Sequence, residues 1–113
     1  MRRADVTGLQ RSAPVFAALG DPRRLSLVQR LSADGPSSLV RLTEGTGITR
    51  QGVSKHLRVL EEAGLVRSAR QGRERIWELE IERMQAARAA LETISAGWDA
   101  ALGRLQAFVE REP

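Results

Sequence analysis

The chain has 113 residues, of which 42% are apolar, and its 18 Lys and Arg exceed its 14 Asp and Glu to give a net charge of +4. That length suits one compact domain over residues 1–113. With no cysteine and one histidine, His56, disulfides and thiolate metal sites are excluded, and the sequence predicts no metal ligands and no cofactor. The charged start of the chain and the lack of any run of about 20 apolar residues predict a cytoplasmic protein with no membrane segment.

The first part of the chain carries three short helical patterns. The apolar residues of segment 11–20 predict a short helix that ends at Gly20. Asp21 then supplies an N-cap oxygen and Pro22 fits the first position of a second helix, which ends near Asp34. Ser37 or Ser38 can cap a third helix, which runs into a glycine-containing turn.

Segment 50–63 has the strongest helical pattern, and Thr49 is suited to be its N-cap. The apolar stripe of this fourth helix is formed by Val53, Leu57 and Leu60. A helical wheel places a polar and basic set on the opposite face: Gln51, Lys55 and Arg58. Two helices joined by a short turn, the second with a polar outer face, indicate a helix-turn-helix.

The pattern then changes to that of a hairpin and returns to that of a helix. Two strands about Gln71 and Gly72 form the simplest hairpin, with Trp77 and Leu79 facing the core. A last helix over 82–110 would span roughly 43 Å at about 1.5 Å per residue. Its apolar stripe consists of Met84, Ala87, Leu91, Ile94, Trp98, Ala101, Leu105 and Phe108.

The order of these elements and two blocks of sequence, "FAALGDPRRLSLVQRL" and "GITRQGVSKHLRVLEEAGLVRSARQGRERIWEL", resemble ArsR-type winged-helix transcriptional repressors over about residues 12–109. The resemblance implies a mainly α fold with a small β-hairpin, a winged helix-turn-helix of order helix–helix–helix–helix–strand–strand–helix. Residues 12–80 would form the core and wing, and 81–110 a C-terminal dimerisation helix. It also implies a homodimer that represses transcription by binding double-stranded operator DNA.

The chain departs from the metal-sensing members of that family. The third helix reads "SSLVRLTEG", without a thiol, and no histidine follows His56. The resemblance is therefore to the subgroup without the metal-binding Cys box. Gly45 and Gly52 stand where alanine is commoner in the family, which predicts a looser helix-turn-helix.

A recognition helix of about 50–63 and a basic wing of about 67–75 are the predicted DNA contacts, because Arg, Lys and Gln donate to base edges and Ser and Thr reach phosphates. For any single residue, an ordinary solvated face stays an alternative, and His56 either meets a phosphate or packs against a turn. The predicted DNA-binding residues are Thr49, Arg50, Gln51, Ser54, Lys55, His56, Arg58, Arg70, Gln71 and Arg73.

The stripe of the last helix outruns the length of a four-helix core and needs a second surface, which a symmetric partner supplies. The predicted dimer interface consists of Val15, Phe16, Leu19, Leu91, Ile94, Trp98, Leu102 and Leu105. An enzyme is not expected, because one His with no Cys or Tyr leaves little for a catalytic site. A winged-helix protein-interaction module that does not bind DNA stays the alternative function, and the sequence names no effector ligand.

Overall fold

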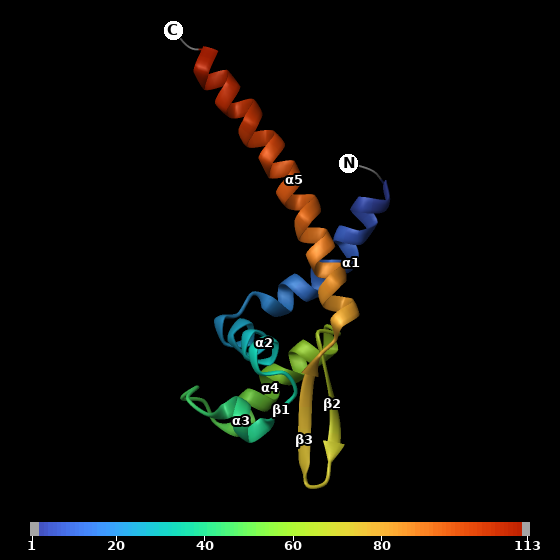
Figure 1. Cartoon of the computed structure of the whole chain (residues 1–113), viewed down its shortest axis with the longest axis vertical. Coiled ribbons are helices and arrows are strands. Elements are labelled where there is room, and N and C mark those ends of the chain that lie inside the picture. Colours follow the sequence, from blue (N-terminus) through green and yellow to red (C-terminus); the bar gives the residue numbers. More distant parts are fainter. Residues whose placement is uncertain (1–2, 112–113) are drawn as a thin grey trace.

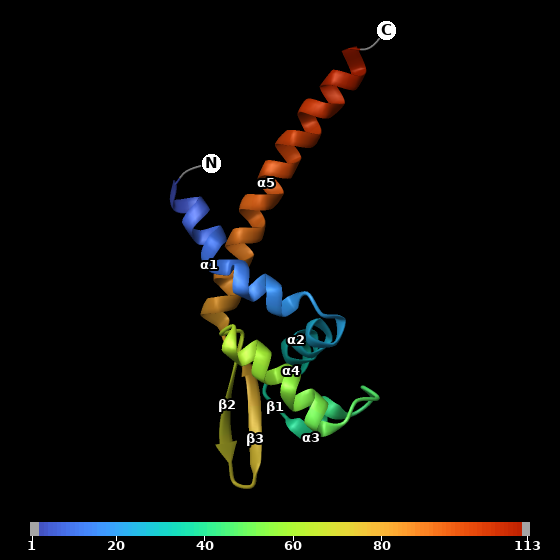
Figure 2. The same cartoon turned by 180° about the vertical axis from the view of Figure 1, so that it is seen from behind.

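Five helices and three strands make up the part of the chain that the computed structural model describes, residues 3–111, with side chains from residue 8 to residue 111. A body of short helices and a small sheet carries one long helix that projects away from it (Figures 1 and 2). In chain order the elements are α1 (Arg3–Leu19), α2 (Pro22–Asp34), β1 (Ser37–Ser38), α3 (Leu39–Thr43), α4 (Arg50–Glu62), β2 (Val66–Gln71), β3 (Glu74–Leu79) and α5 (Ile81–Arg111). The predicted mainly helical winged fold with a long last helix is confirmed.

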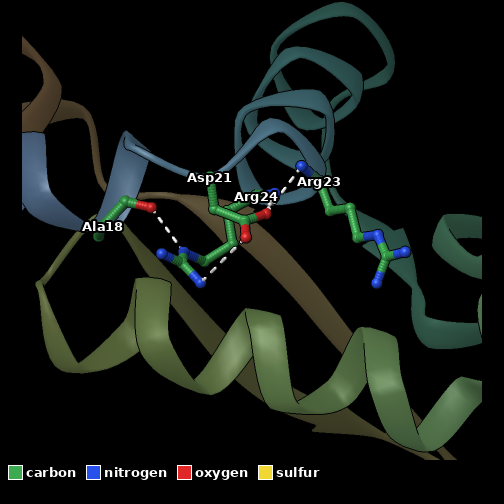
Figure 3. Close-up of polar contacts among 4 residues, drawn as sticks. All are labelled: Ala18, Asp21, Arg23 and Arg24. Carbon is green, nitrogen blue, oxygen red and sulfur yellow. Dashed lines mark hydrogen bonds and ion pairs between the residues drawn. The ribbon is translucent and has the colours of Figure 1, made fainter.

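The turn between α1 and α2 is fixed by the predicted cap. The Asp21 carboxylate accepts hydrogen bonds from the backbone N–H groups of Arg23 (2.8 Å) and Arg24 (3.2 Å) (Figure 3). These bonds, that from Arg24 above all, lower the pKa of Asp21 below its ordinary 3.8. The Arg24 Nε also donates to the Ala18 carbonyl at 2.6 Å, so one side chain joins the end of α1 to the start of α2.

Helix α4 crosses the core of the body. Its three predicted inward residues, Val53, Leu57 and Leu60, are 0% exposed, which confirms the helical pattern read from the sequence. They pack with apolar side chains from every other part of the body: Val15, Leu31, Leu42, Leu65 and Trp77. Burying a Leu side chain stabilises the fold by about 1.5–3 kcal/mol, so this stripe fixes how α4 is rotated about its axis.

The turn between α3 and α4 leads into a close approach at Gly52, and the looser helix-turn-helix stays a prediction. Thr49 Oγ1 accepts from the Gly52 N–H at 3.0 Å and caps α4 as predicted. A Cβ at Gly52 would come within 2.6 Å of Ile48 Cγ2, so Gly52 permits a close approach. Arg30 of α2 donates to the Leu42 carbonyl at 3.0 Å and ties the end of α3 to the body.

The wing belongs to a sheet of three antiparallel strands in the order β1-β3-β2. The hairpin turn falls at Gly72 and Arg73, one residue later than the predicted Gln71 and Gly72. The sequence did not reveal β1, whose two residues pair Ser37 with Trp77 and Ser38 with Ile76. A strand of two residues carries no alternating pattern, and Ser38 also caps α3, so its pairing is a tertiary contact.

Helix α4 ends where the sequence changes from helical to extended. Gly64 has φ +79°, a conformation that favours glycine. The N–H groups of Gly64 and Leu65 donate to the carbonyls of Glu61 and Leu60, both at 2.9 Å. These bonds satisfy the last turn of α4 and lead the chain directly into β2.

Helix α1 is longer than predicted, because it begins at Arg3 rather than near residue 11, and Pro14 lies within it. Proline usually ends a helix at the residue before it, but here α1 packs along the lower part of α5 (Figure 2), and Ser12 and Val15 are buried. Packing thus outweighs the local preference. In the described part of the chain, no helix has the length and apolar character that crossing a membrane requires.

Candidate nucleic-acid interface

The outer face of α4 is polar, basic and free of contact with the core. Arg50, Gln51, Lys55 and Arg58 are exposed and Ser54 is half-buried. A groove of about 280 Å³ runs beside them. The groove is lined by Leu39, Arg50, Gln51, Ser54, Lys55 and Arg58. The structure thus brings together the predicted contacts of the recognition helix.

Two predicted contacts on α4 have structural partners. The Thr49 hydroxyl is engaged as the helix cap described above, although the residue itself is exposed. His56 is half-buried, and it lies near enough to Asp21 to influence the pKa of that carboxylate. His56 therefore lies toward the α1–α2 turn. This position favours packing against that turn, and its contact with DNA stays a prediction.

The remaining predicted contacts lie at the tip of the wing. Arg70, Gln71 and Arg73 are all exposed around the turn between β2 and β3. In Figure 1 the wing extends beyond the helical body on the side opposite to the projecting end of α5. Flexible cations at such a tip can reach a phosphate backbone that flanks the helix site.

The two faces of the wing differ in free charge. On one face Arg67 Nε lies 2.6 Å from Glu78 Oε1 and 3.1 Å from Glu80 Oε1. The bond to Glu78, followed by the charges of both carboxylates, raises the pKa of Arg67 above its ordinary value. Arg67 is therefore balanced by carboxylates of its own chain.

The other face of the wing carries Arg70 and Arg75, which are directly opposite each other on β2 and β3. Alternate residues of a strand share a face, so Arg75 lies on the same side as the buried Trp77. Arg75 Nη1 donates to Ser68 Oγ at 2.8 Å, and Ser68 Oγ donates to Glu61 Oε2 of α4 at 3.2 Å. Arg75 was not among the predicted contacts, but counting in steps of two from Trp77 would have placed it on the side of α4.

The predicted dimer residues divide into two groups. On α5, Met84 and Ala87 pack on the core, and the predicted interface side chains beyond them stay exposed in the single chain. Their exposed fractions are 53% for Leu91, 36% for Ile94, 70% for Trp98, 59% for Leu102 and 58% for Leu105. Phe108 and Val109 continue the same stripe with 63% and 61%.

On α1 one of the three predicted interface residues must be withdrawn. Val15 is 1% exposed and belongs to the core of its own chain, so it has no surface left for a partner. Leu19 is partly buried against the same core, and Phe16 is half-buried. The error arose because the sequence shows that a residue is apolar but not which of two surfaces covers it.

Among the described residues, no three His, Cys, Asp or Glu side chains are grouped as a metal ion requires.

Comparison with known proteins points to one kind of protein. Residues 19–69 match the helix-turn-helix domain family. The uncharacterised HTH-type transcriptional regulator YuzN of Bacillus subtilis strain 168 is 43% identical over 68 residues, which are 55% of this chain and 74% of YuzN. The ArsR-like transcriptional regulator from Rhodococcus sp. RHA1 has a TM-score of 0.69 and 31% identity, over 88% of this chain and 92% of that one. The transcriptional repressor BigR from Xylella fastidiosa has a TM-score of 0.64 and 32% identity, over 83% and 96%.

Proposed function

The chain belongs to the ArsR-type winged helix-turn-helix transcriptional regulators, and we propose that it acts as a homodimeric repressor that binds operator DNA. Membership of this family confirms the resemblance read from the sequence and the prediction that the chain is not an enzyme. The observation that carries the proposal is a basic surface shared by α4 and the wing. It consists of Gln51, Lys55, Arg58, Arg70 and Arg73, all exposed.

The two parts of this surface do different work. Helix α4 enters the major groove, where Arg, Lys and Gln donors match the acceptors of guanine and adenine. At least one of Gln51, Lys55 and Arg58 reads base edges, and Ser54 lies within reach of the backbone. Arg70 and Arg73 of the wing neutralise flanking phosphates and fix the position of the helix without reading bases.

The dimer forms through the exposed stripe of α5, with Phe16 and Leu19 of α1 at its edge. Contiguous apolar side chains of this size on a free surface mark an interaction site, and a second copy presents the same stripe in a symmetric pair. A two-fold dimer places two copies of α4 against one face of the duplex. The operator is then an inverted repeat with half-site centres about 34–36 Å apart.

Repression follows from occupancy, because a dimer bound across two major grooves excludes other proteins from the same DNA. The similarity to BigR, which is described as a transcriptional repressor, supports this direction of control.

The proposal is tested by selecting bound sequences from a random duplex pool and then titrating salt for each variant. Lys55→Ala should remove preference at particular base pairs, with a loss of about 1–3 kcal/mol for a good contact. Arg73→Ala should weaken selected and random duplexes alike and lower the log-affinity against log-salt slope by about 0.9 per subunit.

Arg88→Ala is the matched control. Arg88 is an exposed cation on α5, paired with Glu92 at 3.3 Å, so its loss changes the charge equally but away from the basic surface. If Lys55→Ala and Arg73→Ala both behave like Arg88→Ala on both duplexes, the basic surface is only solvated. The protein-interaction module then becomes the better description.

A further inference from the structure

A hollow of about 290 Å³ lies between α4 and the wing, beside but separate from the groove on the outer face of α4. It is lined by residues from two surfaces that the fold brings together: Ser54, Arg58, Glu61, Ser68, Arg75 and Trp77. The first three lie one turn apart on α4, and the others come from β2 and β3 on the face of the wing that is turned toward α4.

The donors in this hollow exceed the acceptors. Arg58 and Arg75 contribute two positive charges and Glu61 one negative charge, so the hollow has an excess of one positive charge. The hydroxyls of Ser54 and Ser68 add two neutral donors. This set suits an oxyanion, because arginine binds such groups through paired, charge-assisted hydrogen bonds.

Trp77 supplies an independent indication of a ligand. Its side chain is 4% exposed, and its indole N–H is buried with no acceptor among the described residues. Buried donors almost always have a partner, and an unpaired one destabilises the fold. Since Trp77 lines the hollow, an oxygen bound there would lie beside the residue whose donor the chain leaves unpaired.

The charges on the wing point the same way. Arg70 and Arg75 are opposite each other on adjacent strands, an arrangement that is unfavourable for like charges. On the opposite face of the wing, by contrast, the positive charge of Arg67 is balanced by the carboxylates of Glu78 and Glu80. The face toward α4 therefore carries more positive charge than Glu61, the one acidic residue lining the hollow, can balance.

We propose that this hollow binds an oxyanion, and that its occupant on DNA is a backbone phosphate held between the recognition helix and the wing. On the duplex, the sugar-phosphate backbone forms the wall between a major groove and the neighbouring minor groove. When α4 lies in the major groove and the wing lies over the minor groove, this backbone passes between them. Arg58 and Arg75 grip the phosphate from the two sides, and Trp77 donates from below. Arg75 thereby joins the DNA contacts, which rests on the proposed function.

Glu61 acts against this binding. Its Oε2 accepts from Ser68, so Glu61 holds the acceptor position that an incoming oxyanion would take. Binding then requires Ser68 to exchange one acceptor for another, and removing the charge of Glu61 should favour the oxyanion.

The test follows the indole N–H signal of Trp77 by NMR while the intact protein is titrated. The chain has two tryptophans, and Trp98→Phe identifies the signal of Trp77 by removing the other one. One titration uses inorganic phosphate with sodium chloride at equal ionic strength as reference. The other uses a random duplex. A saturable shift of the Trp77 signal in either titration is the expected result.

Four variants give the shift its meaning. Arg75→Gln and Arg58→Gln should each weaken the response about tenfold or more, since each removes a charge-assisted bond. Glu61→Gln should strengthen it. Arg67→Gln removes the same charge from the opposite face of the wing, and it should leave the response unchanged.

The two sources of oxyanion are separated by the two titrations. A response to phosphate alone assigns the hollow to a free oxyanion, and a response to duplex, with a salt slope lowered by about 0.9 per subunit in Arg75→Gln but not in Arg67→Gln, assigns it to the backbone. No shift in either titration, or equal effects of Arg75→Gln and Arg67→Gln, overturns the inference. If the protein binds duplex, the salt slope is unchanged in Arg75→Gln and phosphate gives no response, the oxyanion site is refuted while DNA binding stands. If phosphate gives a response but the protein does not bind duplex, the proposed function is refuted while the oxyanion site stands.

Discussion

Trp98→Glu should separate the dimer into folded monomers. Trp98 is 70% exposed in the single chain, which for a tryptophan of about 250 Å² leaves roughly 175 Å² for a partner to cover. If the partner covers half of it, burial at about 25 cal/mol per Å² stabilises the dimer by about 2 kcal/mol per copy and about 4 kcal/mol in total. Losing that much raises the dissociation constant of the dimer about 1,000-fold, and a carboxylate buried without a partner raises it further.

Sedimentation velocity measures the effect directly. The wild-type protein should sediment near twice 12.4 kDa at micromolar concentration, and Trp98→Glu near 12.4 kDa. The circular dichroism of the Trp98→Glu variant should stay that of a folded protein, because the core formed around α4 does not include Trp98.

Ala100→Glu is the control for this substitution. Two residues along an α-helix differ by about 200° in direction, so exposed Ala100 faces away from the stripe and accepts the same charge without touching it. A dimer that survives Trp98→Glu, or that Ala100→Glu disrupts equally, would show that the stripe of α5 is not the interface.

Three further outcomes are expected. Leu57→Ala, at a site 0% exposed, should lower the free energy of unfolding by about 2–5 kcal/mol in denaturant titrations. Val59→Ala, at a site 39% exposed on the same helix, should lower it by much less. Equal losses would contradict the assigned rotation of α4. Because folding lowers the pKa of Asp21 below 3.8, the carboxylate contributes its full stability above that pH and loses it as the pH falls through the folded-state value. The difference in melting temperature between wild type and Asp21→Asn, which keeps a cap oxygen but does not titrate, should therefore shrink below pH 3.8, and a constant difference would argue against a role for the charge. Stoichiometric zinc should leave the DNA affinity unchanged relative to an EDTA control, since a lone histidine and no cysteine cannot complete a tight site; a tenfold loss would refute this.

Local chemistry in the sequence determined most of the fold. Asp21 before Pro22 and Thr49 before Arg50 marked helix starts because a side-chain oxygen satisfies N–H groups that the helix leaves free. The spacing of Val53, Leu57 and Leu60 determined the face that α4 buries, and with it the polar face that stays exposed. These features act within a few residues of one another, so the order of residues is sufficient to read them.

Tertiary structure decided what depends on residues far apart in the chain. Only the folded sheet shows that Arg67 is balanced by Glu78 while Arg75 turns toward α4, because charge pairing follows from strand register. The same holds for Val15, which looked like an interface residue but is enclosed by its own chain. An apolar side chain carries no mark of whether its own core or another surface will cover it, and that is settled only when the helices pack.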